Sequence, residues 1–194
     1  MLAPVLPISS RAVRMTPIPT LESDRLTLSL LDRTCFDAYE RFYGDADASG
    51  SYGGPLSPAA AWSRLASDVG VWTLQGFGVW AIRRRDEAAV LGVCGFWQGH
   101  GWPTELTWWL LPEARGQGMA LDASRLAVTH AYRDWRWPTV QTYMRDDNIA
   151  ARKLALRLGG RLVDRISFPD GEFRDLFEIP DPAAIEATAS LNNS

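Results

Sequence analysis

Apolar and polar residues alternate along several short stretches of the chain, and such alternation predicts β-strands with one buried face. The stretch RLTLSLL at 25–31 is a clear example. Other stretches combine apolar residues with turn residues at both ends, which is also typical of strands. The predicted strands are 25–31, 77–84, 89–97, 105–111, 139–144, 161–168 and 172–179. The last two flank Pro169-Asp170-Gly171, which favours a hairpin turn.

Between the strands, apolar residues recur at the spacing of a helix, and residues that favour helix starts and stops mark the boundaries. The predicted helices run from a Thr34 cap to about Asp45, from Ser57-Pro58 to about Leu74, from the Gly116–Gly118 turn to about Trp135, and from a cap at Asp146 or Asp147 to Leu158. The Gly, Ser and Asp content of 44–55 predicts a loop.

This order of elements, β-α-α-β-β-β-α-β-α-β-β, indicates a single mixed α/β domain of the α+β kind, built around a central sheet. We expect the domain to span residues 21–180. Residues 1–20 hold four prolines and no periodic pattern, so we expect a flexible N-terminal tail, and we expect a C-terminal tail over 181–194.

The composition excludes several kinds of site. Twenty basic and 23 acidic residues give a net charge of −3, too balanced for a nucleic-acid binder held by bulk electrostatics. Lys153 is the only lysine, so the Gly-Lys pair of a Walker A loop is missing. With two cysteines, Cys35 and Cys94, a four-cysteine zinc site is impossible, and we expect both thiols in the core.

No apolar run approaches the roughly 20 residues that span a bilayer. We therefore expect a cytoplasmic protein, a monomer or homodimer, with neither a membrane nor a nucleic acid as its partner. We expect no metal site.

The stretch ELTWWLLPEARGQGMA at 105–120 carries the strongest chemical signal. A strand ends at Pro112, and Gly116 and Gly118 then open the long helix. Glycines allow a ligand close to the backbone, and the free N–H groups at a helix start attract anions. The Arg115 guanidinium adds a fork that matches phosphate oxygens. A Rossmann fingerprint would need a third glycine where Leu121 stands.

Three segments, in order, resemble the GNAT N-acetyltransferase superfamily. Arg115-x-x-Gly118-x-Ala120 matches its acetyl-CoA pyrophosphate loop, Gln/Arg-x-x-Gly-x-Gly/Ala. NIAARKLALRLGG at 148–160 resembles its second cofactor segment, and LESDRLTLSLL at 21–31 is similar to the opening strand of the ribosomal-protein N-terminal acetyltransferase branch. The resemblance covers 21–179. It implies a mostly antiparallel sheet of about seven strands flanked by about four helices, with the fourth and fifth strands splayed apart.

The resemblance also implies a reaction, in which a primary amine attacks the thioester of acetyl-CoA directly. The amine would be a protein or peptide N-terminus or a small molecule. Acetyl-CoA would then be the cosubstrate, with its pantetheine arm on the strand backbone, its pyrophosphate on the glycine loop and an asparagine bracing the arm. The implied cofactor residues are Trp108, Trp109, Leu110, Arg115, Gly116, Gln117, Gly118, Met119, Ala120 and Asn148.

The catalytic positions depart from the family pattern. Ala155 stands where many members have a tyrosine that protonates the leaving thiolate, and Ala151 stands where the ribosomal branch often has serine. Glu105, at a strand start, is our candidate base, although a solvated strand end explains it equally simply. Tyr143 is our candidate acid, with packing against the sheet as the alternative. His100 lies in a glycine-rich loop, where a histidine is more often merely exposed.

These departures keep two other functions open, a non-catalytic acyl-CoA-binding or sensor domain and a nucleotide or other phosphate binder. The tryptophans near the expected cleft have two interpretations as well. They either pack in the core or form an aromatic wall for the acceptor. They are Trp97, Trp102, Trp108 and Trp109.

Overall fold

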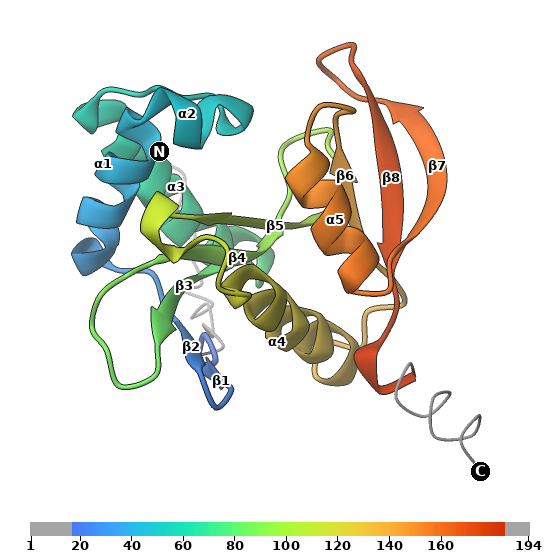
Figure 1. Ribbon diagram of the computed structural model, residues 1–194, viewed down its shortest axis with the longest axis horizontal. Helices are drawn as coiled ribbons and strands as arrows, with labels where there is room; N and C mark the ends of the chain where they lie inside the picture. Colours follow the sequence, from blue (N-terminus) through green and yellow to red (C-terminus); the bar gives the residue numbers. More distant parts are fainter. Residues whose placement is uncertain (1–16, 185–194) are drawn as a thin grey trace, which may run out of the picture.

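The computed structural model describes residues 17–184, which form two antiparallel sheets side by side (Figure 1). The larger sheet has the order β1-β2-β3-β4-β5 and the smaller has the order β6-β8-β7. The strands are β1 (Leu21–Glu22), β2 (Leu26–Ser29), β3 (Val79–Arg84), β4 (Gly92–Trp97), β5 (Glu105–Leu110), β6 (Val140–Met144), β7 (Arg161–Ser167) and β8 (Phe173–Ile179).

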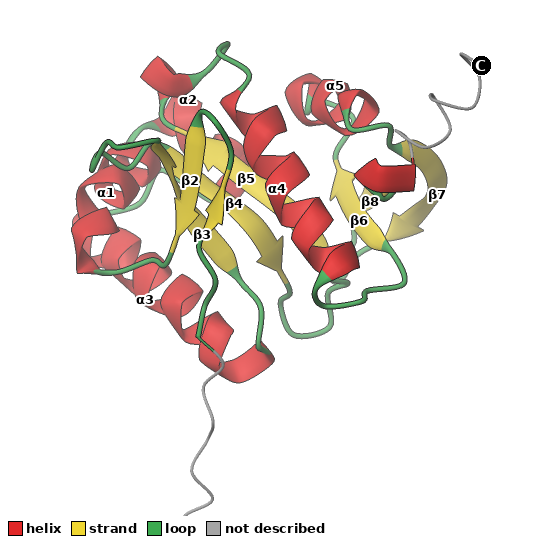
Figure 2. Cartoon of the chain, turned by 90° about the horizontal axis from the view of Figure 1, so that it is seen from below, coloured by secondary structure: helices red, strands yellow, loops and turns green. Residues whose placement is uncertain are grey.

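Helices cover both faces of the larger sheet, as Figure 2 shows. Helix α4 (Met119–Arg133) lies on one face, and α1 (Phe36–Gly44) and α3 (Pro58–Gln75) lie on the other. The short α2 (Ala46–Ser49) follows α1, and α5 (Ile149–Arg157) packs beside β6 and α4. Strand alternation supplies each face with its own core. Trp80 and Ile82 pack on the α4 side, whereas Val79 and Ala81 pack on the side of α1 and α3.

The division between the two sheets falls between β5 and β6, the strands predicted at 105–111 and 139–144. These neighbouring strands share no hydrogen-bonded ladder, because β5 pairs only with β4 and β6 only with β8 among the described residues. The predicted α/β fold is confirmed, with its splay between the fourth and fifth predicted strands. The expected single sheet is realised as one of five strands and one of three.

Local hydrogen bonds explain where our boundary predictions were wrong. Residues 44–55 are not simply a loop, because the Asp45 side chain accepts from the N–H groups of Asp47 and Ala48 and starts α2. A 3₁₀ turn, Gly50–Tyr52, follows directly. The predicted Thr34 cap is wrong, because Asp32 caps a 3₁₀ turn, Arg33–Cys35, and α1 follows that turn directly. The cap of α5 is neither Asp146 nor Asp147 but Asn148, whose side chain accepts from Ala151 N–H.

The last residues of the expected N-terminal tail pack on the domain. Ile18 contacts the core, and the Trp80 indole N–H donates to the Pro19 carbonyl at 2.8 Å. The rest of that tail, and the C-terminal tail beyond residue 184, lie outside the described residues. Cys35 and Cys94 are buried free thiols, as predicted. Within residues 17–184, no helix combines the length and the apolar character needed to cross a membrane.

Candidate active site

Two cavities meet in the gap between β5 and β6. The larger, about 590 Å³, is lined by the segment that links β5 to α4, and we call it the loop cavity. The smaller, about 350 Å³, contains Glu105, and we call it the carboxyl cavity. Both are lined by Ser51, Tyr52, Trp108, Asn148 and Ala151. A molecule that fills the loop cavity can therefore reach a second molecule in the carboxyl cavity.

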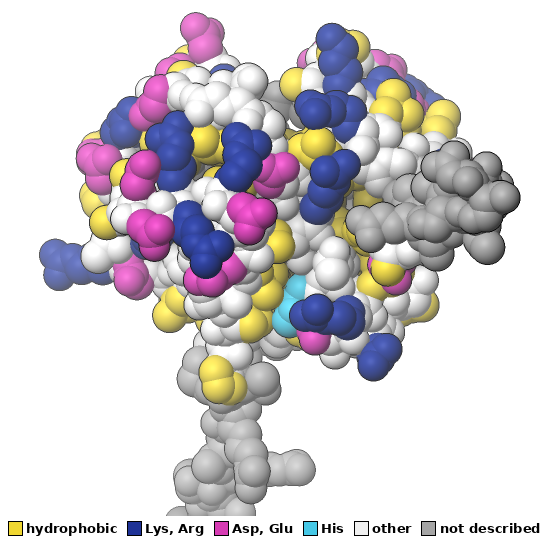
Figure 3. Space-filling model, turned by 60° about the horizontal axis from the view of Figure 1, so that its bottom comes forward, with side chains coloured by type: hydrophobic (Ala, Val, Ile, Leu, Met, Phe, Trp, Pro, Cys, Tyr) yellow, Lys and Arg dark blue, Asp and Glu magenta, His cyan; other side chains and the backbone are white. Residues whose placement is uncertain are grey.

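The glycine loop shapes one end of the loop cavity. Gly116 and Gly118 have φ angles of +74° and +79°, a region that favours glycine. Gly118 directly precedes α4, and no side chain caps this helix start. Its first N–H groups are thus available to a ligand. Arg115, Lys153 and Arg157 also line the cavity. In Figure 3, Lys and Arg side chains lie on both sides of the hollow in this face.

Two arginines hold the glycine loop from behind. Arg25 donates to the Gln117 carbonyl and to the Asp122 carboxylate, both at 2.8 Å. Arg84 donates to the Gln117 side-chain oxygen, also at 2.8 Å. The Gln117 side chain is therefore engaged in a hydrogen bond within the protein. Gln117 is also the one predicted cofactor residue that does not line the loop cavity. We call Arg25 and Arg84 the brace, because their hydrogen bonds fix the loop backbone that presents the free N–H groups.

The other predicted cofactor residues line the loop cavity together. Trp108 and Leu110 belong to β5, and Arg115 Nε donates to the Leu110 carbonyl at 3.1 Å. Asn148 uses its side-chain oxygen to cap α5, at 3.1 Å from Ala151 N–H. Its side-chain amide group can still donate to a ligand.

The carboxyl cavity holds Glu105 beside Tyr143. Burial raises the pKa of Glu105 to about 8, although the Tyr143 hydroxyl and the Arg174 and Arg64 guanidinium groups act in the opposite direction. Burial, and then the charge of Glu105, raise the pKa of Tyr143. The Tyr143 hydroxyl is buried and has no hydrogen-bond partner among the described residues. A carboxyl with this pKa is suited to exchanging a proton near neutral pH.

Comparison with known proteins decides the family. The family model described as acetyltransferase (GNAT) domain matches residues 25–161. The chain belongs to the GNAT acetyltransferase family.

Solved GNAT structures agree with this assignment. An acetyltransferase from Agrobacterium tumefaciens strain C58 has a TM-score of 0.76 and 28% identity, over 84% of this chain and 95% of that chain. A GNAT-family acetyltransferase from Bordetella pertussis has a TM-score of 0.68 and 26% identity, over 84% and 100%. RimL, a ribosomal L7/L12 α-N-protein acetyltransferase in complex with coenzyme A, has a TM-score of 0.67 over 84% and 99%. It is 17% identical, so this likeness extends to the fold alone.

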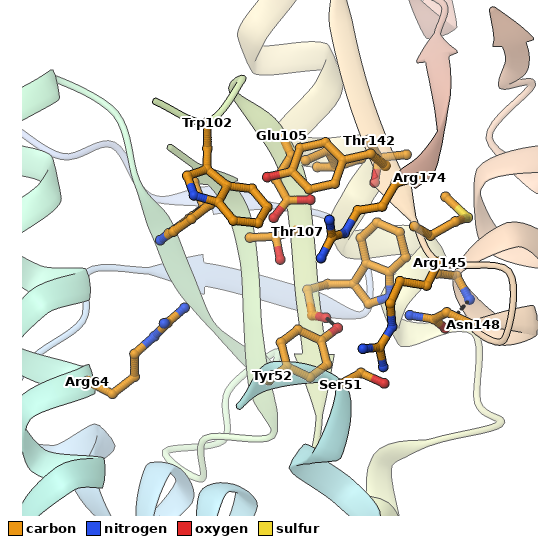
Figure 4. Close-up of a pocket in the computed structure, with 16 residues that line it drawn as sticks. Ser51, Tyr52, Arg64, Trp102, Glu105, Thr107, Thr142, Arg145, Asn148 and Arg174 are labelled. Carbon is orange, nitrogen blue, oxygen red and sulfur yellow. Dashed lines mark hydrogen bonds between the residues drawn. The ribbon is translucent and has the colours of Figure 1, made fainter. Parts of the chain in front are cut away.

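The two cavities share a tyrosine that was not predicted from the sequence. Tyr52 lines both cavities, and its hydroxyl donates a hydrogen bond to the Trp108 carbonyl of β5 (Figure 4). Burial raises its pKa, so the hydroxyl keeps its proton. No motif marks this residue, because it lies in the Gly-, Ser- and Asp-rich segment that predicts a loop. Only the tertiary fold brings it to β5.

The alanines that depart from the GNAT pattern occupy different environments. Ala151 lines both cavities, at the position where they meet. Ala155 is fully buried in the core. A larger side chain at 155 would have to displace core atoms.

The tryptophans divide between the two interpretations. Trp97, Trp102 and Trp108 line the carboxyl cavity. Trp109 does not line the carboxyl cavity but packs in the core against α1, where its ring stacks on that of Phe42 with the ring centroids 4.2 Å apart. The aromatic wall therefore comprises three of the four.

The histidines take no part in either cavity. His100 is exposed and lines neither one. His130 is buried in α4, with Nδ1 2.8 Å from the Asp134 carboxylate.

Proposed function

We propose that this GNAT acetyltransferase is an N-acetyltransferase that moves the acetyl group of acetyl-CoA to a primary amine. The observation that carries the proposal is the meeting of the two cavities in the β5–β6 gap. One cavity has the glycine loop and an uncapped helix start, and the other has a carboxyl whose pKa is about 8. A cofactor and an amine bound in them would touch at Tyr52, Trp108 and Asn148.

Acetyl-CoA fits the loop cavity by its chemistry. The pyrophosphate would accept hydrogen bonds from the N–H groups of the loop and the start of α4, as anions do at helix starts. Arg115, Lys153 and Arg157 would add positive charge around the phosphates. The pantetheine amides would pair with the β5 backbone, and the Asn148 side-chain amide would brace them. The thioester would then lie where the two cavities meet.

In the carboxyl cavity, Glu105 would accept a proton from the amine, directly or through one water molecule. The neutral amine would attack the thioester carbonyl carbon and form the C–N bond. As the C–S bond breaks, CoA would leave as a thiolate, and the extra proton on the nitrogen would pass to that thiolate, directly or through water. Holding both reactants in contact is itself a large part of such catalysis.

Tyr52 is better placed than Tyr143 to stabilise the departing thiolate, because Tyr52 lines both cavities and Tyr143 lines only the carboxyl cavity. A thiol has a pKa of about 8.5, well below that of a buried tyrosine. The Tyr52 hydroxyl would therefore donate a hydrogen bond to the sulfur and keep its own proton. Tyr143 would remain a neighbour of Glu105 in the carboxyl cavity.

Calorimetry with acetyl-CoA and a thiol-release assay over a panel of amines test this proposal. We expect binding, and steady release of free CoA with at least one amine. No binding at millimolar acetyl-CoA would contradict the proposal. Competition with ATP and NAD distinguishes an acetyl-CoA enzyme from a general phosphate binder, because the latter would bind ATP or NAD more tightly than CoA.

Binding without turnover on any amine would favour a non-catalytic acyl-CoA sensor, an alternative motivated by Ala151 and Ala155. Turnover above the rate of hydrolysis in water rejects that alternative. Peptides in the panel test transfer to a protein N-terminus.

A further inference from the structure

The carboxyl cavity has an excess of positive charge. Arg64, Arg145 and Arg174 line it, against one acidic residue, Glu105. Because the pKa of Glu105 is about 8, this carboxyl is mostly uncharged at neutral pH. A site built only for a cationic amine would have the opposite balance. An arginine of this cavity that is not balanced by a carboxylate of the protein is therefore a candidate to bind a negatively charged group of the acceptor.

Two of these arginines already have carboxylate partners within the protein. Arg174 donates to Asp170, with a distance of 2.9 Å from Nη1, and lies 5.1 Å from the centre of the Trp102 ring. Arg64 Nε lies 3.5 Å from the buried Asp68 carboxylate, which also accepts from a tyrosine hydroxyl. Their charges are largely balanced before any ligand arrives.

Arg145 differs from both in its exposure rather than in its distance to a carboxylate, because the side chains of Arg64 and Arg174 are only 35% and 12% exposed. Its nearest carboxylate is that of Asp147, 3.5 Å from Nε, and both side chains are about half exposed or more, at 48% and 72%. Such exposed pairs contribute little. In Figure 4, Arg145 approaches the cavity from the side of Asn148, opposite Arg64. Its terminal nitrogens have no hydrogen-bond acceptor among the described residues. The planar fork of Arg145 is thus available to a ligand in the cavity.

We propose that the acceptor amine also carries a carboxylate, and that Arg145 binds this carboxylate. The proposal rests on the N-acetyltransferase function proposed above. An arginine fork and a carboxylate match in geometry and can form two parallel hydrogen bonds. The cavity, about 350 Å³, is at the small end of ligand pockets, which span roughly 300–1,000 Å³. It suits a single amino acid or one terminal residue, whose side chain would pack against Trp97 and Trp102.

The test compares each amino acid with its own amide as acceptor, using CoA release from acetyl-CoA as the measurement. The amide keeps the amine and the side chain but lacks the carboxylate charge. Amidation also lowers the pKa of the amine, which by itself favours the amide. We expect the best free acid to exceed its amide in kcat/KM by about tenfold or more, the scale of one charged hydrogen bond. Peptides that begin with Asp or Glu, against Asn or Gln, show whether the carboxylate belongs to a peptide side chain.

The variant Arg145→Gln assigns the effect to this residue. We expect its kcat/KM for the acid to fall to the level of the amide, whereas Arg161→Gln keeps the wild-type preference. Arg161 is a suitable control because it is an exposed arginine on β7 that lines neither cavity. Circular dichroism and acetyl-CoA affinity check that both variants are folded.

Three results would overturn the proposal: equal rates for acid and amide, a preference for polyamines, or an undiminished acid preference in Arg145→Gln. If no amine is acetylated, that failure counts against the proposed function, and binding still tests this inference. The tryptophans that line the cavity then report acid and amide binding by fluorescence in the presence of CoA. Tighter binding of the acid, lost in Arg145→Gln, supports the proposal, and equal binding overturns it.

Discussion

The loop cavity and the carboxyl cavity share a boundary, but different parts of the chain build them. Many residues of the loop cavity come from one segment, between Trp108 of β5 and Leu121 of α4, which includes the glycine loop and the uncapped start of α4. The carboxyl cavity takes its polar groups from side chains on separate elements, including Arg64 of α3, Glu105 of β5 and Arg174 of β8.

This difference has a chemical meaning. Backbone N–H groups at a helix start recognise a phosphate whatever the neighbouring side chains are, so one short motif is sufficient. Side chains collected from distant elements can change one at a time without disturbing the fold. We therefore expect the loop cavity to bind the cofactor proposed above, and we expect the carboxyl cavity to select the acceptor.

The largest effect is expected from Gly118→Trp, which tests whether the backbone builds the loop cavity. A side chain at φ +79° strains the backbone, and an indole would fill the space in front of the α4 start. We expect calorimetry to detect no acetyl-CoA binding. Gly171→Ala is the control, because Gly171 also has a positive φ, +82°, but lies in the β7–β8 turn. Unchanged affinity in Gly118→Trp would show that the phosphates bind elsewhere.

The next largest effect is expected from Glu105→Gln, in the carboxyl cavity. Loss of a general base typically costs about 10²-fold or more in kcat, whereas acetyl-CoA affinity should be retained. A base acts only without its proton, so kcat/KM of the wild type should rise with pH through about 8 as Glu105 ionises. That inflection should be missing in the variant. A variant that keeps both the rate and the inflection would remove Glu105 from the mechanism.

Tyr52→Phe tests the boundary that the two cavities share. We expect about a tenfold fall in kcat, equivalent to one lost hydrogen bond, with acetyl-CoA affinity within a fewfold of wild type. Tyr43→Phe is a matched control, because the Tyr43 hydroxyl is buried with no hydrogen-bond partner in residues 17–184, and Tyr43 lines neither cavity. If both variants behave alike, Tyr52 has only a packing role.

The smallest effect is expected from Arg25→Gln, which loosens the brace behind the glycine loop. Arg25 is more than half exposed, so its ion pair with Asp122 contributes modestly. We expect the KM for acetyl-CoA to rise about three- to fivefold. Arg33→Gln provides the comparison, because Arg33 is exposed and contacts neither cavity. An unchanged KM would mean that Arg84 holds Gln117 without help.

The elements, and the glycine loop that lines the loop cavity, could largely be predicted from the sequence because their signals are local. Strand alternation, the Ser57-Pro58 helix start and the two loop glycines depend on residues a few positions apart. The errors were also local. Asp45 caps α2 inside a segment whose composition indicates a loop. Asn148, rather than Asp146 or Asp147, caps α5.

The carboxyl cavity could be predicted only in part, because its members are far apart in the chain. Glu105 and Tyr143 were found because each belongs to a strand that borders the gap. Tyr52, Arg64 and Arg174 had no such signal. These three side chains reach the carboxyl cavity only because α3, β8 and the 3₁₀ turn pack around it, and no short motif encodes that packing.

The hydrogen bond from Tyr52 to the Trp108 carbonyl has a consequence for the catalytic cycle. If the pantetheine amides pair with the β5 backbone as proposed, the arriving cofactor competes with Tyr52 for the same carbonyl. The hydroxyl is released at the moment when a thioester becomes available to receive it. Cofactor binding would then free the Tyr52 hydroxyl for the reaction. Without acetyl-CoA, the hydroxyl would stay bonded to the Trp108 carbonyl.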